Sequence, residues 1–301
     1  MDGTAIGIDL GGTYIKGVAT DPEGNILGWE KLSTQRNKGV EHVLSRLDTL
    51  IGSLSEKGRP LKAVGIGIPG MLDVQRERVI LAPNLDWRDL DLGAGLRQRF
   101  GVPVFLENDA NVAALGEAWL GAARNSSCFL LVTIGTGIGS GLILHRKIWP
   151  GSHGLAGELG HMTIEPGGPL CSCGQKGCLE TLVSGPAILS RALEASIVGE
   201  EAEVKDVLEL VRKGNREAAR VVDQAMDYLA IGLKNTIVLL DLDLILIGGG
   251  IGEAGELFID RLQETTASLL PVPRDFKIVQ ASLGNKAGAL GAARLAFKNL
   301  S

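Results

Sequence analysis

The chain has 301 residues, of which 45% are hydrophobic and 22% are charged. This length and composition are typical of a globular protein with about two domains and a large buried core. The net charge of −5, without a long basic run, argues against a nucleic-acid surface, which needs clustered lysine and arginine.

Targeting signals are not recognisable in the sequence. The first residues, MDGTAIGIDLGGT, contain neither a basic region nor a continuous apolar stretch, so no signal peptide is predicted. The longest apolar run, at 237–247, is interrupted by Asp241 and Asp243 and is shorter than the roughly 20 apolar residues that a membrane span needs. We therefore expect a cytoplasmic protein.

The pattern of apolar residues predicts alternating strands and helices. Strands are expected near 4–10, 14–20 and 26–33, then a helix over 40–56, a strand at 62–68, a helix near 89–100, a strand at 102–106 and a helix at 108–120. A second group of strands is expected to start near 128. Helices dominate 185–241, a strand is expected at 243–247, and helices are expected at 252–269 and 286–299. Mixed strands and helices with buried β-branched runs indicate an α/β fold.

An internal similarity suggests that the fold is duplicated. When residues 6–27 are laid over 130–151, Gly11 falls on Gly135 and Gly17 on Gly141. Both segments read as strand, glycine turn, strand, then another turn and a third strand. Two such halves would each offer a phosphate-binding hairpin to a shared cleft. The boundary would lie near 117–122, so we assign 1–118 to a small domain and 119–285 to a larger one.

Three glycine turns are candidates for nucleotide binding. Their backbone amides can approach a phosphate closely, and a carboxylate beside the first turn could hold Mg²⁺ through water. A plain β-hairpin explains each turn equally well when it is considered alone, and neither a Walker loop nor a dinucleotide fingerprint fits. Together they predict an ATP site that uses Asp9, Gly11, Gly12, Thr13, Gly135, Thr136, Gly137, Gly249 and Gly250.

A carboxylate stands at the junction of a predicted strand and helix, in the segment VFLENDANVAALGEAWL. Asp109 could be a simple helix N-cap, because aspartate is common at that position. It could instead face the crevice at the carboxyl ends of the strands and accept the proton of a sugar hydroxyl, while Asn108 binds a neighbouring hydroxyl.

A metal site is predicted from one histidine and three closely spaced cysteines. His161, Cys171, Cys173 and Cys178 form a Cys₃His set suited to a closed, tetrahedral zinc site. Gly174 and Gly177 would allow the short loop to fold back. Free thiols or a redox pair are the alternatives, although Cys171 and Cys173 are too close for an easy disulfide. Two glutamates, Glu158 and Glu180, flank this set. Isolated glutamates are usually solvated, but on a rigid loop they could accept hydrogen bonds from sugar hydroxyls.

Three segments resemble the ROK family of bacterial sugar kinases and sugar-responsive repressors: DLGGT at 9–13, ENDAN at 107–111, and GELGHMTIEPGGPLCSCGQKGCLE at 157–180. The last is long and specific, whereas the first is general among actin- and hexokinase-like ATPases. The resemblance implies a duplicated, actin/hexokinase-like (ribonuclease H-like) two-domain fold with a central ligand cleft, in which the C-terminal helix at about 286–301 packs back on the N-terminal domain.

The resemblance also implies the roles of the site residues. Asp109 would be the general base, His161 and the three cysteines would bind zinc, and the sugar would contact Gly70, Asn84, Asn108, Asp109, Glu158, His161 and Glu180. One departure concerns the position after GGT, where many relatives carry lysine and this chain has Tyr14, with Lys16 two residues further on.

The expected function is phosphorylation of a hexose with ATP and Mg²⁺. The PNLDWRD segment at 83–89 looks like the glucokinase version of a sugar-side loop and favours glucose, with a fructokinase or an N-acetylhexosamine kinase as alternatives. A sugar-sensing repressor is expected to carry a helix-turn-helix before the first strand, for which we see no room here. A non-catalytic binding relative is disfavoured by the presence of Asp109, and polyphosphate is an alternative phosphoryl donor. Family kinases often form a homodimer or homotetramer, but no interface is recognisable in the sequence.

Overall fold

The computed structural model describes residues 3–55, 60–252 and 256–300. These residues form two units. The first comprises residues 1–127, 141–157 and 282–301, and the second comprises 128–140 and 158–281. The chain therefore passes between the units near residues 127, 140, 157 and 281.

The main sheet of the first unit is built around a buried central strand. Its five strands have the order β3-β2-β1-β4-β8, and their bounds are β1 (Thr4–Leu10), β2 (Tyr14–Thr20), β3 (Ile26–Ser33), β4 (Leu61–Ile68) and β8 (Val104–Asn108). β1 pairs antiparallel with β2 and parallel with β4. Residues alternate between the two faces of a strand, so one side of β1 presents Ile6, Ile8 and Leu10, and the other presents Ala5 and Gly7.

A second sheet repeats this order, β11-β10-β9-β12-β13. Its strands are β9 (Phe129–Ile134), β10 (Ile138–Leu144), β11 (Lys147–Ile148), β12 (Leu244–Gly248) and β13 (Lys277–Gln280). β9 pairs parallel with β12, and β12 parallel with β13, as β1 does with β4 and β4 with β8. The duplication and the α/β class predicted from the sequence are confirmed. β11 is the third strand expected in the segment 130–151, whereas β13 was not predicted.

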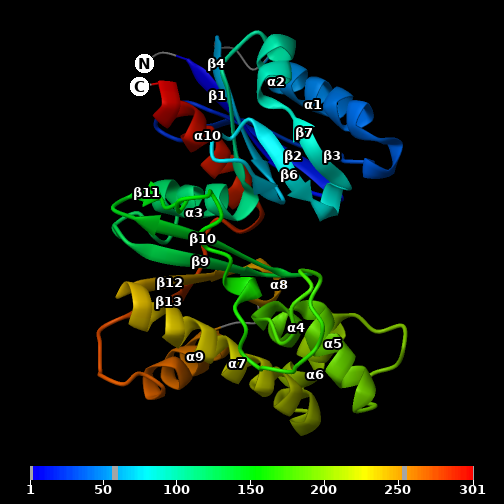
Figure 1. Cartoon of the computed structure of the whole chain (residues 1–301), viewed down its shortest axis with the longest axis vertical. Helices are drawn as coiled ribbons and strands as arrows, with labels where there is room; N and C mark the ends of the chain where they lie inside the picture. The colour runs from blue at the N-terminus through cyan, green and yellow to red at the C-terminus, as the bar shows by residue number, and fades with distance from the viewer. Residues whose placement is uncertain (1–2, 56–59, 253–255, 301) are drawn as a thin grey trace. The chain divides into compact units, whose positions relative to one another are not determined.

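Helices cover both faces of the first sheet. They are α1 (Val40–Ser55), α2 (Gly93–Phe100), α3 (Asp109–Leu120) and α10 (Ala287–Leu300), with short 3₁₀ turns at η1 (Arg36–Lys38), η2 (Pro83–Leu85) and η4 (Gly284–Lys286). α1 buries Val43, Leu47, Leu50 and Leu54, at spacings of three and four, in the same core as Ile6 and Ile8. α10, drawn in red in Figure 1, packs on the other face against β1, β4 and α3.

A small third sheet corrects one prediction. β5 (Met71–Leu72), β6 (Arg78–Ala82) and β7 (Trp87–Asp91) pair antiparallel in that order. The helix predicted over 89–100 is therefore wrong at its start, because residues 89–91 continue β7 and α2 begins only at Gly93. β6 supplies the hydrogen bonds that hold β7 extended, and its pairing with a strand about ten residues away was not recognised in the sequence.

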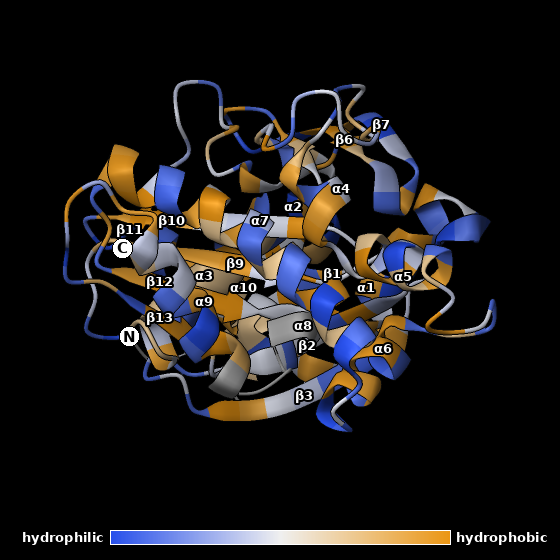
Figure 2. Ribbon diagram, turned by 90° about the horizontal axis from the view of Figure 1, so that it is seen from below, coloured by the Kyte–Doolittle hydropathy of each residue, from blue (hydrophilic) through white to orange (hydrophobic). Residues whose placement is uncertain are grey.

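The second unit is mostly helical around its sheet. It contains α4 (Leu179–Val183), α5 (Gly185–Glu194), α6 (Val204–Arg212), α7 (Arg216–Leu240), α8 (Gly249–Gly252), α9 (Glu256–Ser268) and the 3₁₀ turn η3 (Leu159–His161). Residue 252 of the helix predicted over 252–269 belongs to α8, and residues 256–268 form α9. Residues 253–255 lie outside the described ranges, as does residue 56 of the helix predicted over 40–56. Figure 2 shows both hydrophilic and hydrophobic residues along α6, and its buried residues are Val207 and Leu208. Across the described ranges, no helix combines the length and the apolar character that crossing a membrane requires.

Backbone-to-backbone packing holds α10 on the sheet. A Cβ atom at Gly7 would overlap the carbonyl oxygen of Ala289, and one at Gly65 would overlap that of Ala292.

We expect Gly7→Ala to lower the free energy of unfolding by about 3 kcal/mol, because the helix must move away from the sheet. Gly52→Ala is the matched control: nothing lies within 4 Å of its Cβ position in α1, so it should raise stability by about 0.5–1 kcal/mol. Urea denaturation of both variants tests this, and equal stabilities would contradict it.

Candidate active site

The strand–helix junction carries Asp109 at the first residue of α3. Asn108, not Asp109, is the N-cap: its backbone is extended, and its Oδ1 atom accepts hydrogen bonds from the N–H groups of Ala110 and Asn111 at 2.9 and 3.1 Å. Asp109 Oδ1 also accepts from Ala110 N at 2.9 Å. Because Asn108 caps the helix, the Asp109 carboxylate is not required as the cap.

Asn108 also connects this junction to the GIPG loop. Its Nδ2 atom donates to the carbonyl oxygen of Gly70 at 3.1 Å, which leaves the second N–H bond of the amide available for a ligand. Gly70 is pressed against β6, where a Cβ atom would overlap the carbonyl oxygen of Leu81. The structure thus brings together three of the predicted sugar-side residues: Gly70, Asn108 and Asp109.

We expect Asn108→Ala to destabilise the protein by about 1–2 kcal/mol through loss of the cap, and also to impair activity by releasing Gly70. Asn215→Ala provides a matched control. Asn215 caps α7 through two similar bonds, to Glu217 N and Ala218 N, both 3.0 Å. Asn215→Ala should lower the free energy of unfolding by a similar amount and leave turnover unchanged. Thermal melts and steady-state kinetics test this, and equal activity losses in the two variants would contradict it.

The first glycine turn is held by side chains from neighbouring strands. The Thr34 hydroxyl donates to Gly11 O at 2.6 Å, and Thr34 N donates to Thr13 O at 2.9 Å. Gly12 lies against the 83–89 loop, because a Cβ atom there would be 2.5 Å from Asn84 O. The exposed Asn84 is therefore placed beside the predicted phosphate turn, and its carbonyl oxygen also accepts a bond from Arg36 Nη1 at 2.7 Å.

Lys16 has a partner that the sequence did not suggest. It lies opposite Asp9 in the β1–β2 ladder, and its Nζ atom is 3.1 Å from Asp9 Oδ2. Tyr14 is half-exposed and has the Lys31 ammonium 3.8 Å above its ring centroid. Asp9 is thus paired with the Lys16 ammonium, and Tyr14 packs against the Lys31 ammonium.

The second glycine turn, Gly135–Gly137, is tied to the helix that follows the metal cluster. Glu180 Oε2 accepts from Ile138 N at 2.9 Å, and a Cβ atom at Gly137 would lie 2.5 Å from the same oxygen. Gly135 O accepts from Gly185 N at 2.8 Å. Gly249 has a positive φ of 81° and packs directly on Ile134 at the end of β9. Within the second unit, Glu180, Gly249 and the 135–137 turn therefore come together.

The structure brings His161 and the three cysteines into one cluster. Their ligand atoms all lie within 4.8 Å of one another. His161 Nδ1 is 3.6 Å from Cys171 Sγ, and Cys173 Sγ is 3.6 Å from Cys178 Sγ. A tetrahedral zinc ion with its usual bond lengths would give separations of roughly 3.6–3.8 Å, so the donor set fits zinc.

The loop around the cluster depends on two glycines. Gly174 and Gly177 have positive φ angles of 88° and 69°. Gly177 also packs on Glu165, whose carbonyl oxygen would overlap any Cβ atom there. Burial, reinforced by the neighbouring thiols, raises the pKa of the Cys178 thiol to about 12, so a bound cation would be needed to stabilise its thiolate at neutral pH.

Glu158 lies three residues before His161 of this cluster and interacts with it electrostatically. Burial is the main cause that raises the pKa of Glu158; Glu180 raises it further, and His161 opposes the shift. His161 turns its Nδ1 atom towards Cys171, which leaves its Nε2 atom for a ligand. The second unit therefore gathers Glu158, His161 and Glu180 around the predicted metal site.

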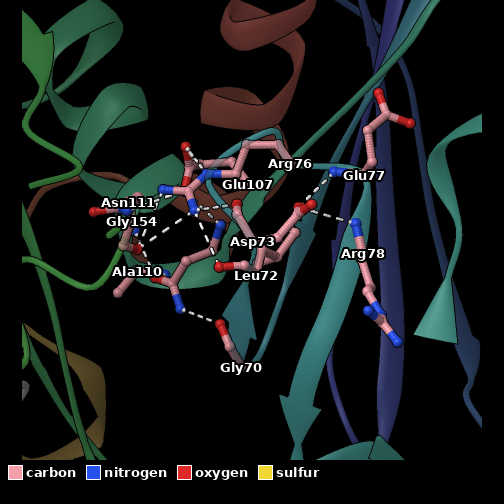
Figure 3. Close-up of polar contacts among 11 residues, drawn as sticks. Gly70, Leu72, Asp73, Arg76, Glu77, Arg78, Glu107, Ala110, Asn111 and Gly154 are labelled. Carbon is pink, nitrogen blue, oxygen red and sulfur yellow. Dashed lines mark hydrogen bonds and ion pairs between the residues drawn. The ribbon is translucent and has the colours of Figure 1, made fainter. Parts of the chain in front are cut away.

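Arg76 and Glu107 were not among the predicted site residues. They form a largely buried ion pair (Figure 3), with Arg76 Nε 3.1 Å from Glu107 Oε2. A buried carboxylate at the end of an apolar strand needs a cationic or hydrogen-bonding partner. The position of Glu107 in the sequence could therefore have indicated that such a partner exists. The partner lies 31 residues away and could not be chosen among the chain's other cations.

Comparisons with known proteins show which family the chain resembles. A match to the ROK family spans residues 5–299. The chain is 36% identical to the glucokinase of Thermotoga maritima over 306 residues, covering 96% of both proteins. It is also 36% identical to a putative xylose repressor of a Caldicellulosiruptor species over 277 residues, covering 87% of this chain and 69% of that protein.

A solved structure is similar over the whole chain. The ROK family glucokinase from Streptomyces griseus, in complex with glucose and AMPPNP, superposes with a TM-score of 0.85 and 35% identity, covering 98% of this chain and 100% of that one. The fold is thus the duplicated actin/hexokinase-like fold of ROK sugar kinases. The family match, the shared sequence and the shared fold together identify the chain as a member of the ROK family.

Proposed function

We propose that this protein is an ATP-dependent hexose kinase that converts glucose to glucose 6-phosphate, with Asp109 as the general base. The observation that carries the proposal is the placement of Asp109 at the start of α3. Asn108, rather than Asp109, caps this helix, and it also donates a hydrogen bond to Gly70 O. The similarity to glucokinases, one of them solved with glucose and AMPPNP, supports the same function. We place the reaction in the cytoplasm, where ATP is available.

In the proposed mechanism, the Asp109 carboxylate accepts the proton of the glucose 6-hydroxyl. The oxygen then forms a bond to the γ-phosphorus as the bond to the β,γ-bridging oxygen breaks, and ADP leaves. Phosphoryl transfer depends mostly on positioning and charge stabilisation, so one well-placed base is sufficient. Asn108 Nδ2, Glu158, His161 Nε2 and Glu180 would orient the sugar hydroxyls.

The phosphates are assigned to the glycine turns. Gly11–Thr13 in the first unit, and Gly135–Gly137 with Gly249 and Gly250 in the second, would present backbone amides to ATP. A magnesium ion bound with ATP would neutralise charge on the phosphates, and Asp9 would hold it through water. Zinc would be structural: bound by His161 and the three cysteines, it would keep the loop that carries Glu158 and Glu180 rigid.

A hexose panel tests the proposal. We expect ADP release with ATP and Mg²⁺ to be fastest with glucose, and slower with mannose, fructose, N-acetylmannosamine or N-acetylglucosamine, because single hydroxyl contacts decide this discrimination. Phosphorus NMR should identify a 6-phosphate. A higher kcat/KM with another hexose would reassign the substrate within the same activity, and polyphosphate as the donor tests the ATP assignment.

A sugar-responsive regulator is the second candidate, because a putative xylose repressor is as similar in sequence as the glucokinase. A regulator would bind xylose or glucose in calorimetry and release no ADP with any sugar of the panel. Binding without turnover would therefore replace the kinase proposal with this one.

A further inference from the structure

A largely buried ion pair is bonded to the residues on either side of the proposed base. The side chains of Arg76 and Glu107 are 15% and 8% exposed, and Glu107 precedes Asn108 and Asp109 at the end of β8. Its Oε2 atom takes the Arg76 Nε bond, and its Oε1 atom accepts from Asn108 N at 2.9 Å and from Asn111 Nδ2 at 3.1 Å. Both oxygens of this carboxylate are thus engaged at the residues that surround Asp109.

The other end of the guanidinium binds two further segments (Figure 3). Its Nη1 atom donates to Asp73 O in the turn between β5 and β6 at 3.0 Å, and both Nη atoms are 3.4 Å from Gly154 O. Gly154 belongs to the 149–157 loop, which leads along the chain to Glu158. One side chain therefore joins the hairpin turn, the strand end that carries the base, and this loop.

The local backbone is unusual on both sides of this contact. Arg76 has a φ of 58°, a left-handed conformation that costs a non-glycine residue free energy. Gly154 has a φ of 76°, and a Cβ atom there would be 2.6 Å from Arg76 Nη1. Asp73 Oδ1 holds the turn by accepting from Glu77 N at 2.8 Å and Arg78 N at 3.1 Å. Strain of this kind persists where surrounding contacts hold the geometry, and it points to a functional constraint.

We propose that Arg76 is a positioning residue for the phosphoryl transfer. It neutralises Glu107 next to the base and fixes the end of β8 and the 149–157 loop to one point. This inference rests on the kinase function proposed above. A displacement of about 1 Å at a reacting group can cost roughly 100-fold in rate, so loss of the guanidinium should appear mainly in kcat. Lysine would be a poor substitute, because one ammonium group cannot reproduce the planar fork that reaches Glu107 and Gly154 together.

Four variants test this role: Arg76→Met, Arg76→Lys, the double variant Arg76→Met/Glu107→Gln, and Arg78→Met as the control. We expect Arg76→Met to lower kcat by about 10- to 100-fold and to lower the thermal midpoint, since it leaves Glu107 buried without its cation. The double variant removes that charge and keeps an acceptor for Asn108 N and Asn111 Nδ2. The thermal midpoint of the double variant should therefore return towards the wild-type value, while its kcat stays low.

Arg78 is the matched control because it lies on the same hairpin, with a side chain that is 46% exposed and pairs only with the exposed Asp89 and Asp91 among the described residues. Arg78→Met should keep the wild-type kcat. Recovery of kcat together with the midpoint in the double variant would show a purely structural role and overturn the proposal. Arg76→Lys decides the matter if the methionine variants do not fold: a kcat at least about tenfold below wild type supports the proposal, and a wild-type kcat overturns it.

The wild-type protein separates this inference from the proposed function. If it phosphorylates no hexose of the panel, the kinase proposal fails before any variant is measured. If it is active and the Arg76 variants are equally active, only the role of Arg76 is refuted.

Discussion

Replacement of Asp109 by asparagine is expected to lower kcat for glucose phosphorylation by about 10²–10⁴-fold, because the amide cannot accept the hydroxyl proton. The variant should fold normally. Asn108 provides the α3 cap, so the change leaves that cap in place, and the lost interaction between the carboxylate and the helix dipole is worth about 0.3–1 kcal/mol. Glucose affinity, measured by calorimetry, should fall far less than kcat.

Asp227→Asn is the matched control for this experiment. The Asp227 side chain is exposed on α7, in the second unit, and none of the proposed site residues belongs to that helix. It should leave kcat, KM and stability close to wild type. If Asp109→Asn retained kcat within about threefold of wild type, the carboxylate could not be the base, because a general base contributes at least about 100-fold.

Replacement of Cys178 by serine is expected to abolish metal binding and destabilise the second unit. The protein as purified should contain about one zinc ion per chain, and the variant far less, because a tetrahedral Cys₃His site has no spare ligand. Cys178 is fully buried, and the cluster anchors the segment with Glu158, His161 and Glu180. Structural zinc contributes folding free energy directly, so we expect a loss of several kcal/mol and a large loss of glucose affinity.

Cys128→Ser is the control for this second experiment, since Cys128 lies outside the cluster. It should keep its metal content and its glucose affinity. Mass spectrometry of the metals, with glucose calorimetry before and after treatment with a chelator, gives the measurement. A wild-type protein that never contains metal, or a Cys178→Ser variant that binds glucose normally, would contradict the zinc assignment.

The long elements could be predicted because their signals are local. The alternation in β1 and the spacing of Val43, Leu47, Leu50 and Leu54 in α1 each specify a buried face within a few residues. The duplication was foreseen from the correspondence of Gly11 with Gly135, but the strand order of the sheets was not. The short strands β5, β6, β7 and β13 were also not foreseen, because strands of two to five residues depend on their partners for hydrogen bonds.

The same distinction between local and tertiary signals applies to the site residues. Residue type and spacing were enough to foresee the cluster of His161 with three cysteines, because thiolates and imidazole bind zinc through their own chemistry and the loop is short. Asn108 rather than Asp109 as the cap, Lys16 against Asp9, and Arg76 against Glu107 emerged only on folding. Each depends on which of several chemically equivalent side chains the tertiary packing brings within about 3 Å, and local sequence carries no record of that choice.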